Sequence, residues 1–190
     1  MKTGILGGTF DPIHLGHLRA AESAREALGL DRVVFVPAHV PPHRVDPVSS
    51  PLDRYAMVAL ATAGNPAFSA SDIELRREGP SYTVDTVCGW LKENPGDSVV
   101  VIVGSDTFPD MATWRQPEKL FALSRVAVVS RPGQELDGLG DAPPGTERVE
   151  GPALPISATL VRRRAAAGLS VRYLVPDEVA EYIAKRGLYR

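Results

Sequence analysis

The chain has 190 residues, of which 44% are hydrophobic and 23% are charged, and its formal net charge is −2. This length and composition are typical of one globular domain, so we expect a single domain over residues 1–190. The near-neutral charge argues against a nucleic-acid partner, and the longest apolar runs are too short to span a bilayer, so we expect neither nucleic acid nor a membrane as a partner.

A single cysteine, Cys88, bears on the compartment of the protein. It cannot form an intramolecular disulfide, and no other Cys or His stands at the spacing of a metal site, so we expect a buried, inert thiol. The glycine-rich stretch begins within the first ten residues, which argues against a signal peptide. These features favour a cytoplasmic protein.

The first forty residues predict a strand, a glycine loop, a helix and a second strand. These elements are, in order, the strand Thr3–Leu6, the loop at Gly7 and Gly8, the helix His17–Leu28 and the strand Val33–Val36, which Pro37 closes. Such a succession is a βαβ unit with two parallel strands and a right-handed crossover.

Further helices and strands alternate along the rest of the chain. Ser50, Pro51 and Asp53 predict a helix start, with a capping serine, a proline at the first helical position and a capping box. The later elements are, in order, the helix Asp53–Ala63, the strand Phe68–Ile73, the helix Thr83–Glu93, the strand Val99–Val103, a helix from Gln116 to Leu123, the strand Val126–Val129, and the helices Ser157–Ala167 and Asp177–Arg186. Residues 131–151 are rich in Gly, Pro and acidic residues, so we expect a surface loop there.

Strands that alternate with helices predict an α/β fold, here a Rossmann-like three-layer sandwich with a mainly parallel sheet. In such sheets ligands bind at the carboxyl ends of the strands. Polar or glycine-rich turns follow three of the predicted strands, at Gly7-Gly8, at Pro37 and at Gly104-Ser105-Asp106. We therefore expect these turns to gather along one edge of the sheet.

The strongest indication of chemistry is the stretch GGTFDPIHLGH at residues 7–17. Its two glycines let a phosphate approach the backbone N–H groups, and the helix that begins near Gly16 adds the positive end of its dipole. His14 and His17 are three residues apart, so both rings can point the same way and donate hydrogen bonds to phosphate oxygens. Either histidine alone would be better explained as an incidental turn residue. The stretch lacks a convincing third zinc ligand, a P-loop Gly-Lys-Ser/Thr and the dinucleotide glycine fingerprint.

This stretch resembles the Gly-Gly-Thr-Phe-Asp-Pro-x-His-x-Gly-His signature of the nucleotidyltransferase superfamily, and more narrowly that of the bacterial nicotinate-nucleotide adenylyltransferases. The resemblance implies that His14 and His17 grip the phosphates of ATP and stabilise the transition state. It also implies an ATP site lined by Gly7, Gly8, Thr9 and Phe10.

Two further segments resemble phosphate-binding parts of the same family. Residues 37–44, PAHVPPHR, resemble its Pro-Pro-His-Lys/Arg loop, a stiff mount for the cationic side chains of His43 and Arg44. Without the rest of the pattern, a proline-rich surface connector would be the better interpretation of that loop.

Residues 156–162, ISATLVR, resemble the family's Ile-Ser-x-Thr-x-x-Arg motif. Ser157 and Thr159 stand at a predicted helix start, where hydroxyls and unpaired N–H groups suit a phosphate, and both are assigned to the ATP site. Arg162 lies one turn further on the same side, and we assign it to phosphates too.

Two segments resemble the part of the family that binds the acceptor. Residues 81–86, SYTVDT, resemble the segment that recognises a pyridine ring and its carboxylate, which implies that Thr86 donates to a planar anion. Gly104 and Asp106, followed by Trp114, resemble a Gly-x-Asp…Trp stretch, in which the carboxylate accepts from a ribose and the indole stacks on the pyridine ring. Taken singly, the first segment is an ordinary helix cap, and Trp114 is equally consistent with a half-buried core residue. Arg115 stands where a more neutral residue is expected, which bears on pyridine recognition.

The resemblance covers nearly the whole chain and implies transfer of the adenylyl group of ATP to nicotinic acid mononucleotide, with deamido-NAD and pyrophosphate as products in NAD biosynthesis. The acceptor phosphate is already an anion, so the reaction needs positioning and charge stabilisation and no protein nucleophile. The implied catalytic residues are His14, His17, Arg44 and Arg162, and His43 joins the acceptor-binding residues. Mg²⁺ is the expected cofactor, held mainly by the ATP phosphates, with no metal site built by the protein itself.

Two alternatives stay open at this point. The acceptor could be nicotinamide mononucleotide or both pyridine nucleotides, whereas Thr86 and Trp114 argue against pantetheine phosphate. A non-catalytic nucleotide-binding protein ranks lower, because the residues that would handle phosphate are all present. A homo-oligomer is compatible with the sequence, which does not give the oligomeric state.

Overall fold

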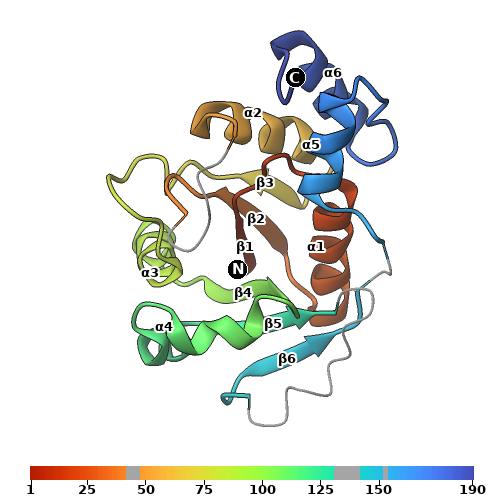
Figure 1. The fold of residues 1–190 in the computed structure, drawn as a ribbon. Helices are drawn as coiled ribbons and strands as arrows, with labels where there is room; N and C mark the ends of the chain where they lie inside the picture. Colours follow the sequence, from red (N-terminus) through yellow and green to blue (C-terminus); the bar gives the residue numbers. More distant parts are fainter. Residues whose placement is uncertain (42–47, 131–141, 152–153) are drawn as a thin grey trace.

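The computed structural model describes residues 1–41, 48–130, 142–151 and 154–190 (Figure 1). Its centre is a six-stranded sheet in the order β3-β2-β1-β4-β5-β6, in which each neighbouring pair is parallel. The strands are β1 (Lys2–Gly8), β2 (Arg32–Pro37), β3 (Phe68–Ala70), β4 (Ser98–Gly104), β5 (Arg125–Val129) and β6 (Thr146–Val149). The helices are α1 (Leu15–Leu28), α2 (Pro51–Thr62), α3 (Thr83–Glu93), the 3₁₀ helix η1 (Phe108–Thr113), α4 (Pro117–Leu123), α5 (Ala158–Ala166) and α6 (Asp177–Arg186).

Helices cover both faces of the sheet, as Figure 1 shows. Successive residues of a strand face opposite sides, and in β1 Leu6 faces one helical layer while Ile5 faces the other. The Leu6 side packs against α1, α2, α5 and α6, and the Ile5 side packs against α3, η1 and α4. Both faces of the central strands are apolar, as a parallel sheet between two helical layers requires. The predicted three-layer α/β sandwich is confirmed.

Most predicted elements are confirmed, because the residues expected to begin or end the helices do so. The Ser50 hydroxyl caps α2 by accepting the N–H of Asp53 at 3.1 Å. Gly29 and Gly187 end α1 and α6 with left-handed backbone, at φ 58° and φ 61°.

Three expectations need correction. Residues 146–149, expected inside a loop, form β6 at the edge of the sheet. Only Val149 of this strand is buried, so the apolar pattern that would mark a strand is missing. The strand predicted over 68–73 ends at Ala70, and Cys88 is half-buried rather than buried.

No helix among the described residues is both long enough and apolar enough to cross a membrane.

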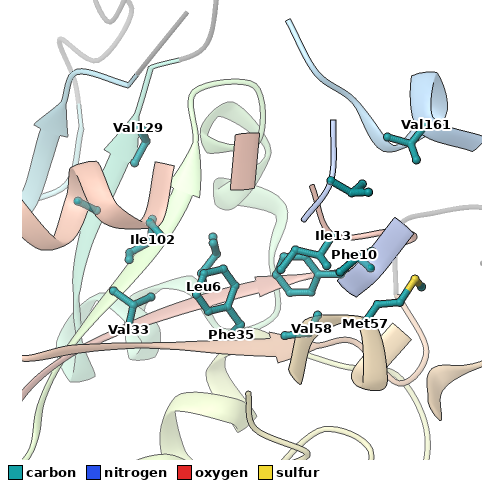
Figure 2. Close-up of a cluster of buried hydrophobic side chains, with 14 of the residues drawn as sticks. Leu6, Phe10, Ile13, Val33, Phe35, Met57, Val58, Ile102, Val129 and Val161 are labelled. Atoms are coloured by element: carbon teal, nitrogen blue, oxygen red, sulfur yellow. The ribbon is translucent and has the colours of Figure 1, made fainter. Parts of the chain in front are cut away.

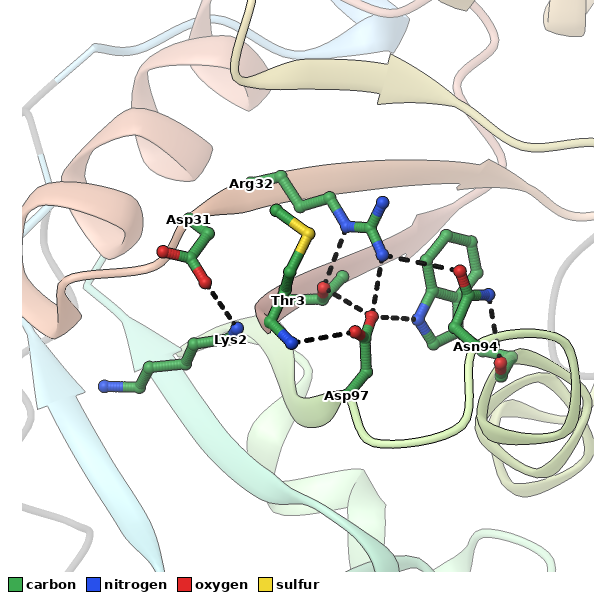
Figure 3. A network of polar contacts seen from close by, with 8 residues as sticks. Lys2, Thr3, Asp31, Arg32, Asn94 and Asp97 are labelled. Carbon is green, nitrogen blue, oxygen red and sulfur yellow. Dashed lines mark hydrogen bonds and ion pairs between the residues drawn. The ribbon is translucent and has the colours of Figure 1, made fainter.

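A buried carboxylate ties the amino ends of β1 and β4 together (Figure 3). The side chain of Asp97 is 8% exposed and accepts hydrogen bonds from Arg32 at 2.7 Å, Thr3 at 2.9 Å, the Met1 amino group at 3.0 Å and the Trp90 indole at 3.1 Å. Burial alone would raise the pKa of Asp97, but these donors outweigh it and hold the pKa well below its ordinary range. The network fixes β1 beside β4, and the candidate site lies at the opposite ends of these strands.

Asp97→Asn keeps the shape of this side chain and removes its charge, so we expect the variant to be about 1–3 kcal/mol less stable at pH 7. In the wild type the pKa of Asp97 is lower in the folded than in the unfolded chain. The stability that it contributes is therefore complete above the unfolded pKa of about 3.9 and declines as the pH falls below that value. The gap between the two proteins should narrow by about 1 kcal/mol between pH 7 and pH 3, measured by urea unfolding. A gap that stays constant would contradict this account.

Candidate active site

The site lies where the direction of the strand order reverses. From β1 the chain passes through α1 to β2 on one side, whereas β4, on the other side of β1, leads on to β5 and β6. The carboxyl ends of β1 and β4 diverge at such a point and leave a crevice. A cavity of about 370 Å³ opens there, and five of the predicted residues line it: His14, His17, Gly104, Asp106 and Ser157.

The two histidines of the signature form a stacked pair at the start of α1. Their ring centroids are 3.6 Å apart and the rings are inclined by 22°. His14 is the residue that caps α1, with extended backbone, and it is 4% exposed, whereas His17 is half-buried at the cavity. The backbone N–H of His14 donates to Nδ1 of His17 at 3.2 Å. With Nδ1 as the acceptor, a neutral His17 ring carries its proton on Nε2.

The lack of a side chain at Gly16 leaves room for the His14 ring. A Cβ atom at Gly16 would lie 3.0 Å from Nδ1 and 3.1 Å from Cε1 of that ring. Gly7, at the end of β1, is exposed and borders open space. A ligand can therefore come close to the backbone there, beside the positive end of α1.

The loop between β1 and α1 is anchored by an aromatic side chain (Figure 2). Phe10 has left-handed backbone at φ 50°, and its ring is 3% exposed. The ring lies edge-on to His17, with a centroid distance of 5.1 Å, and 6.0 Å from the ring of Phe35. The resemblance assigned Phe10 to the ATP site, and the structure puts its side chain in the core, where it supports His17 from behind.

The next residue of the loop, Asp11, has a buried side chain that bonds to two other segments of the chain. Its side chain is 4% exposed and accepts hydrogen bonds from the Tyr189 hydroxyl at 2.6 Å, from the Val48 N–H at 2.8 Å and from the Ser49 hydroxyl. Three segments that are distant in the sequence therefore meet at one carboxylate.

Arg162 joins α5 to the same loop. One of its guanidinium nitrogens donates to the Asp11 carbonyl at 2.7 Å, and another donates to the Thr159 hydroxyl at 3.2 Å. The Ser157 hydroxyl caps α5 by accepting the N–H of Leu160 at 3.1 Å, and Ser157 and Thr159 are both exposed. The motif at residues 156–162 is thus brought beside the histidine loop.

Arg54 of α2 supports the loop from inside the protein. It is 0% exposed and donates to the carbonyls of Thr9 at 2.8 Å, His39 at 3.2 Å and Ser49 at 3.4 Å. Burial lowers the pKa of Arg54, and the charge of nearby Asp11 opposes that effect. Sequence reasoning missed Arg54, Asp11 and Tyr189 as site-forming residues. Asp11 stood inside the signature and could have been considered. The resemblance also extends to the tail Gly187-Leu188-Tyr189 but gives it no role, and nothing in the pattern marks Arg54.

The residues predicted for the acceptor are only partly brought to the cavity. Thr86 is 1% exposed, its hydroxyl donates to Glu74 at 2.5 Å and accepts from Arg77 at 2.7 Å, and its N–H donates to the Tyr82 carbonyl at 3.2 Å. Burial raises the pKa of Glu74. The donors of Thr86 are thus engaged within the protein.

Trp114 and Arg115 lie on the helical layer built by α3 and α4. Trp114 is half-buried, packs against the apolar cluster of that layer and does not line the described cavity. The guanidinium of Arg115 lies 4.8 Å from the centre of the Tyr82 ring and 3.3 Å from the Asp85 carboxylate. The unexpected Arg115 is therefore held at the start of α3.

His43 and Arg44 fall outside the described residues. Within the part of the chain that the structure describes, no group of three or more His, Cys, Asp or Glu side chains is arranged to hold a metal ion.

Comparisons with known proteins agree with this geometry. The cytidylyltransferase-like family matches residues 5–164. A relative from Herpetosiphon aurantiacus, named "Probable nicotinate-nucleotide adenylyltransferase", is 47% identical and the match covers 99% of this chain and 98% of the relative. A relative of the same name from Thermus thermophilus is 47% identical over 100% of both chains. The chain also has the fold of a nicotinic acid mononucleotide adenylyltransferase of Plasmodium falciparum complexed with NaAD, with a TM-score of 0.84, 18% identity and coverage of 100% of this chain and 98% of that one.

Gly16→Ala should separate stability from ligand handling. Alanine favours a helix over glycine by about 1 kcal/mol, so the melting temperature should hold or rise. The added methyl group would push the His14 ring by a few tenths of an ångström and disturb its stack on His17. The expected adenylyl transfer, measured by release of pyrophosphate, should then fall on the order of tenfold. Gly89→Ala is the control, since Gly89 is also helical and its Cβ would meet only the flexible end of Ile73, at 3.1 Å. Equal activity in the two variants would contradict the role given to Gly16.

Proposed function

The chain belongs to the cytidylyltransferase-like family and, within it, to the nicotinate-nucleotide adenylyltransferases, and on that premise we propose that it transfers the adenylyl group of ATP to nicotinic acid mononucleotide. The products are deamido-NAD and pyrophosphate, the reaction belongs to NAD biosynthesis in the cytoplasm, and residues 1–190 act as one domain. The observation that carries the proposal is the stacked pair of His14 and His17 at the start of α1, in the crevice between β1 and β4.

In the proposed reaction a phosphate oxygen of the acceptor attacks the α-phosphorus of ATP. A new oxygen–phosphorus bond forms, the bond from the α-phosphorus to the bridging oxygen breaks, and pyrophosphate leaves with the electron pair. The attacking oxygen is already negative, so no side chain has to act as a nucleophile or as a strong base. What the protein supplies is alignment of the two substrates and stabilisation of the charge that grows on the phosphates.

The residues at the crevice suit that task. The Nε2–H of His17 is the donor that we assign to the ATP phosphates, because Nδ1 is occupied by the His14 backbone. The positive end of α1 and the open backbone at Gly7 favour an anion in the same place. Arg162 adds a fixed positive charge, already oriented by its bonds to Asp11 and Thr159.

We propose that ATP binds as its Mg²⁺ complex, with the ion held by the phosphates of the nucleotide. The described residues offer no cluster of metal ligands, so we assign the ion no protein ligand. The ion would supply further neutralisation of phosphate charge.

Acceptor recognition rests on fewer contacts. Gly104 and Asp106 at the end of β4 line the cavity, and an exposed carboxylate there suits the hydroxyl groups of a ribose. For Thr86 to donate to a pyridine carboxylate, its bond to Glu74 has to be exchanged.

A pyrophosphate-release assay with ATP and Mg²⁺ tests the function. Nicotinic acid mononucleotide, nicotinamide mononucleotide and pantetheine phosphate are compared side by side. We expect turnover with the first to exceed turnover with the second at least tenfold, and none with the third. Equal rates with both pyridine nucleotides would keep the reaction and remove the acceptor preference, and no release with any acceptor would contradict the proposal.

His17→Ala tests the role of the histidine pair. Loss of a donor that acts on the transition state should lower kcat by roughly 10²-fold or more. Circular dichroism and a melting curve check that the variant folds, since His17 also accepts the N–H of His14. Turnover close to that of the wild type in a folded variant would rule out this assignment.

A further inference from the structure

We propose that Tyr189, acting through Asp11, is a positioning residue that holds the loop between β1 and α1 in the form that binds ATP. The inference deepens the proposed function and rests on it for the identity of the nucleotide. It goes beyond the residues assigned to ATP and to the acceptor, because Tyr189 is none of them and its hydroxyl bonds to Asp11 and Ser49.

The contact is direct and buried. The Tyr189 hydroxyl lies 2.6 Å from Oδ1 of Asp11 and 3.1 Å from the Ser49 hydroxyl, and Ser49 bonds to the same Oδ1 atom. Tyr189 is 9% exposed, and burial raises the pKa of its phenol. The phenol is therefore protonated at neutral pH and can donate to Asp11.

Asp11 transmits the contact to the phosphate-binding parts. It lies three residues before His14, and its carbonyl accepts a hydrogen bond from the Arg162 guanidinium. Its carboxylate also accepts hydrogen bonds from the Val48 N–H and the Ser49 hydroxyl. These are the first described residues after the predicted cations His43 and Arg44. A shift of Asp11 would thus be felt both by the loop that carries His14 and by Arg162 of α5.

Tyr189 supplies a large share of what holds this carboxylate in place. A buried carboxylate needs its donors, and hydrogen bonds to a charged group are stronger than those between neutral groups. Without the phenol, the donors to the Asp11 carboxylate that remain among the described residues are the Val48 N–H and the Ser49 hydroxyl, so the loop can relax away from the geometry that sets the histidine stack.

The chain offers a matched control in Tyr182. Its hydroxyl donates to Oδ1 of Asp53 at 2.9 Å, so it too makes a phenol–carboxylate bond between the C-terminal part of the chain and α2. Asp53 also forms an ion pair with Arg186 and accepts a hydrogen bond from the Ser50 hydroxyl at the start of α2. It makes no described bond to the loop between β1 and α1. Tyr182→Phe and Tyr189→Phe therefore remove the same chemical group, the first from a partly buried bond and the second from a buried one.

The experiment measures binding of ATP with Mg²⁺ by calorimetry, without acceptor, together with melting temperature and with kcat and KM in the pyrophosphate assay. We expect Tyr189→Phe to raise the Kd and KM for ATP about tenfold, as loss of one hydrogen bond to a charged group predicts, while the KM for the acceptor changes less than twofold. Tyr182→Phe should lower the melting temperature by no more than Tyr189→Phe does, and it should leave both ATP constants within twofold.

A second variant, Asp11→Asn, tests the route. If Tyr189 acts through Asp11, adding Tyr189→Phe to Asp11→Asn should weaken ATP binding by less than twofold further. Additive losses, equal losses in the two tyrosine variants, or ATP binding by Tyr189→Phe within twofold of the wild type would each overturn the inference. A wild-type protein that binds ATP without turning over any acceptor would defeat the proposed function and leave this test intact, whereas a wild type that binds no ATP would defeat both.

Discussion

The loop between β1 and α1 contains peptide carbonyls at partly buried positions, and two arginines donate hydrogen bonds to them. Arg54 donates to the Thr9 carbonyl from inside the fold, and Arg162 donates to the Asp11 carbonyl from α5. A carbonyl that is withdrawn from water costs more when it is left unpaired than a made hydrogen bond contributes, so these bonds favour the observed path of the loop. The stack of His14 on His17 and the approach to the open backbone at Gly7 depend on that path.

The sheet supplies the rigid frame for this loop. Apolar side chains alternate between two helical layers along β1 and β4. A slip of one residue would send each of them into the opposite layer and disturb the packing of both. The Asp97 network fixes the same two strands at their amino ends. With both strands fixed, their carboxyl ends diverge at a set place, and loops rather than the sheet carry the ligand-binding groups.

The sequence allowed the fold and the centre of the site to be predicted, because both depend on local signals. Strand and helix alternation, the cap at Ser50 and the stop at Gly187 each act within a few residues, and the histidine stack follows from a three-residue spacing at a helix start. Long-range polar contacts were out of reach: Asp11 and Tyr189 are 178 positions apart, and no periodicity links them. β6 was missed because a strand at the sheet edge with one buried residue has no apolar pattern. The assignments of Thr86 and Trp114 came from resemblance alone, and the structure shows both engaged with their own surroundings.

The distance in sequence between Asp11 and Tyr189 has a consequence for the order of events during synthesis. A ribosome makes Asp11 and the whole histidine signature early, and it makes the phenol that holds the loop 178 residues later. Contacts of such separation form only after a large loss of chain entropy, so they come late in folding. A growing chain therefore carries every residue of the signature long before Tyr189 is present to bond Asp11.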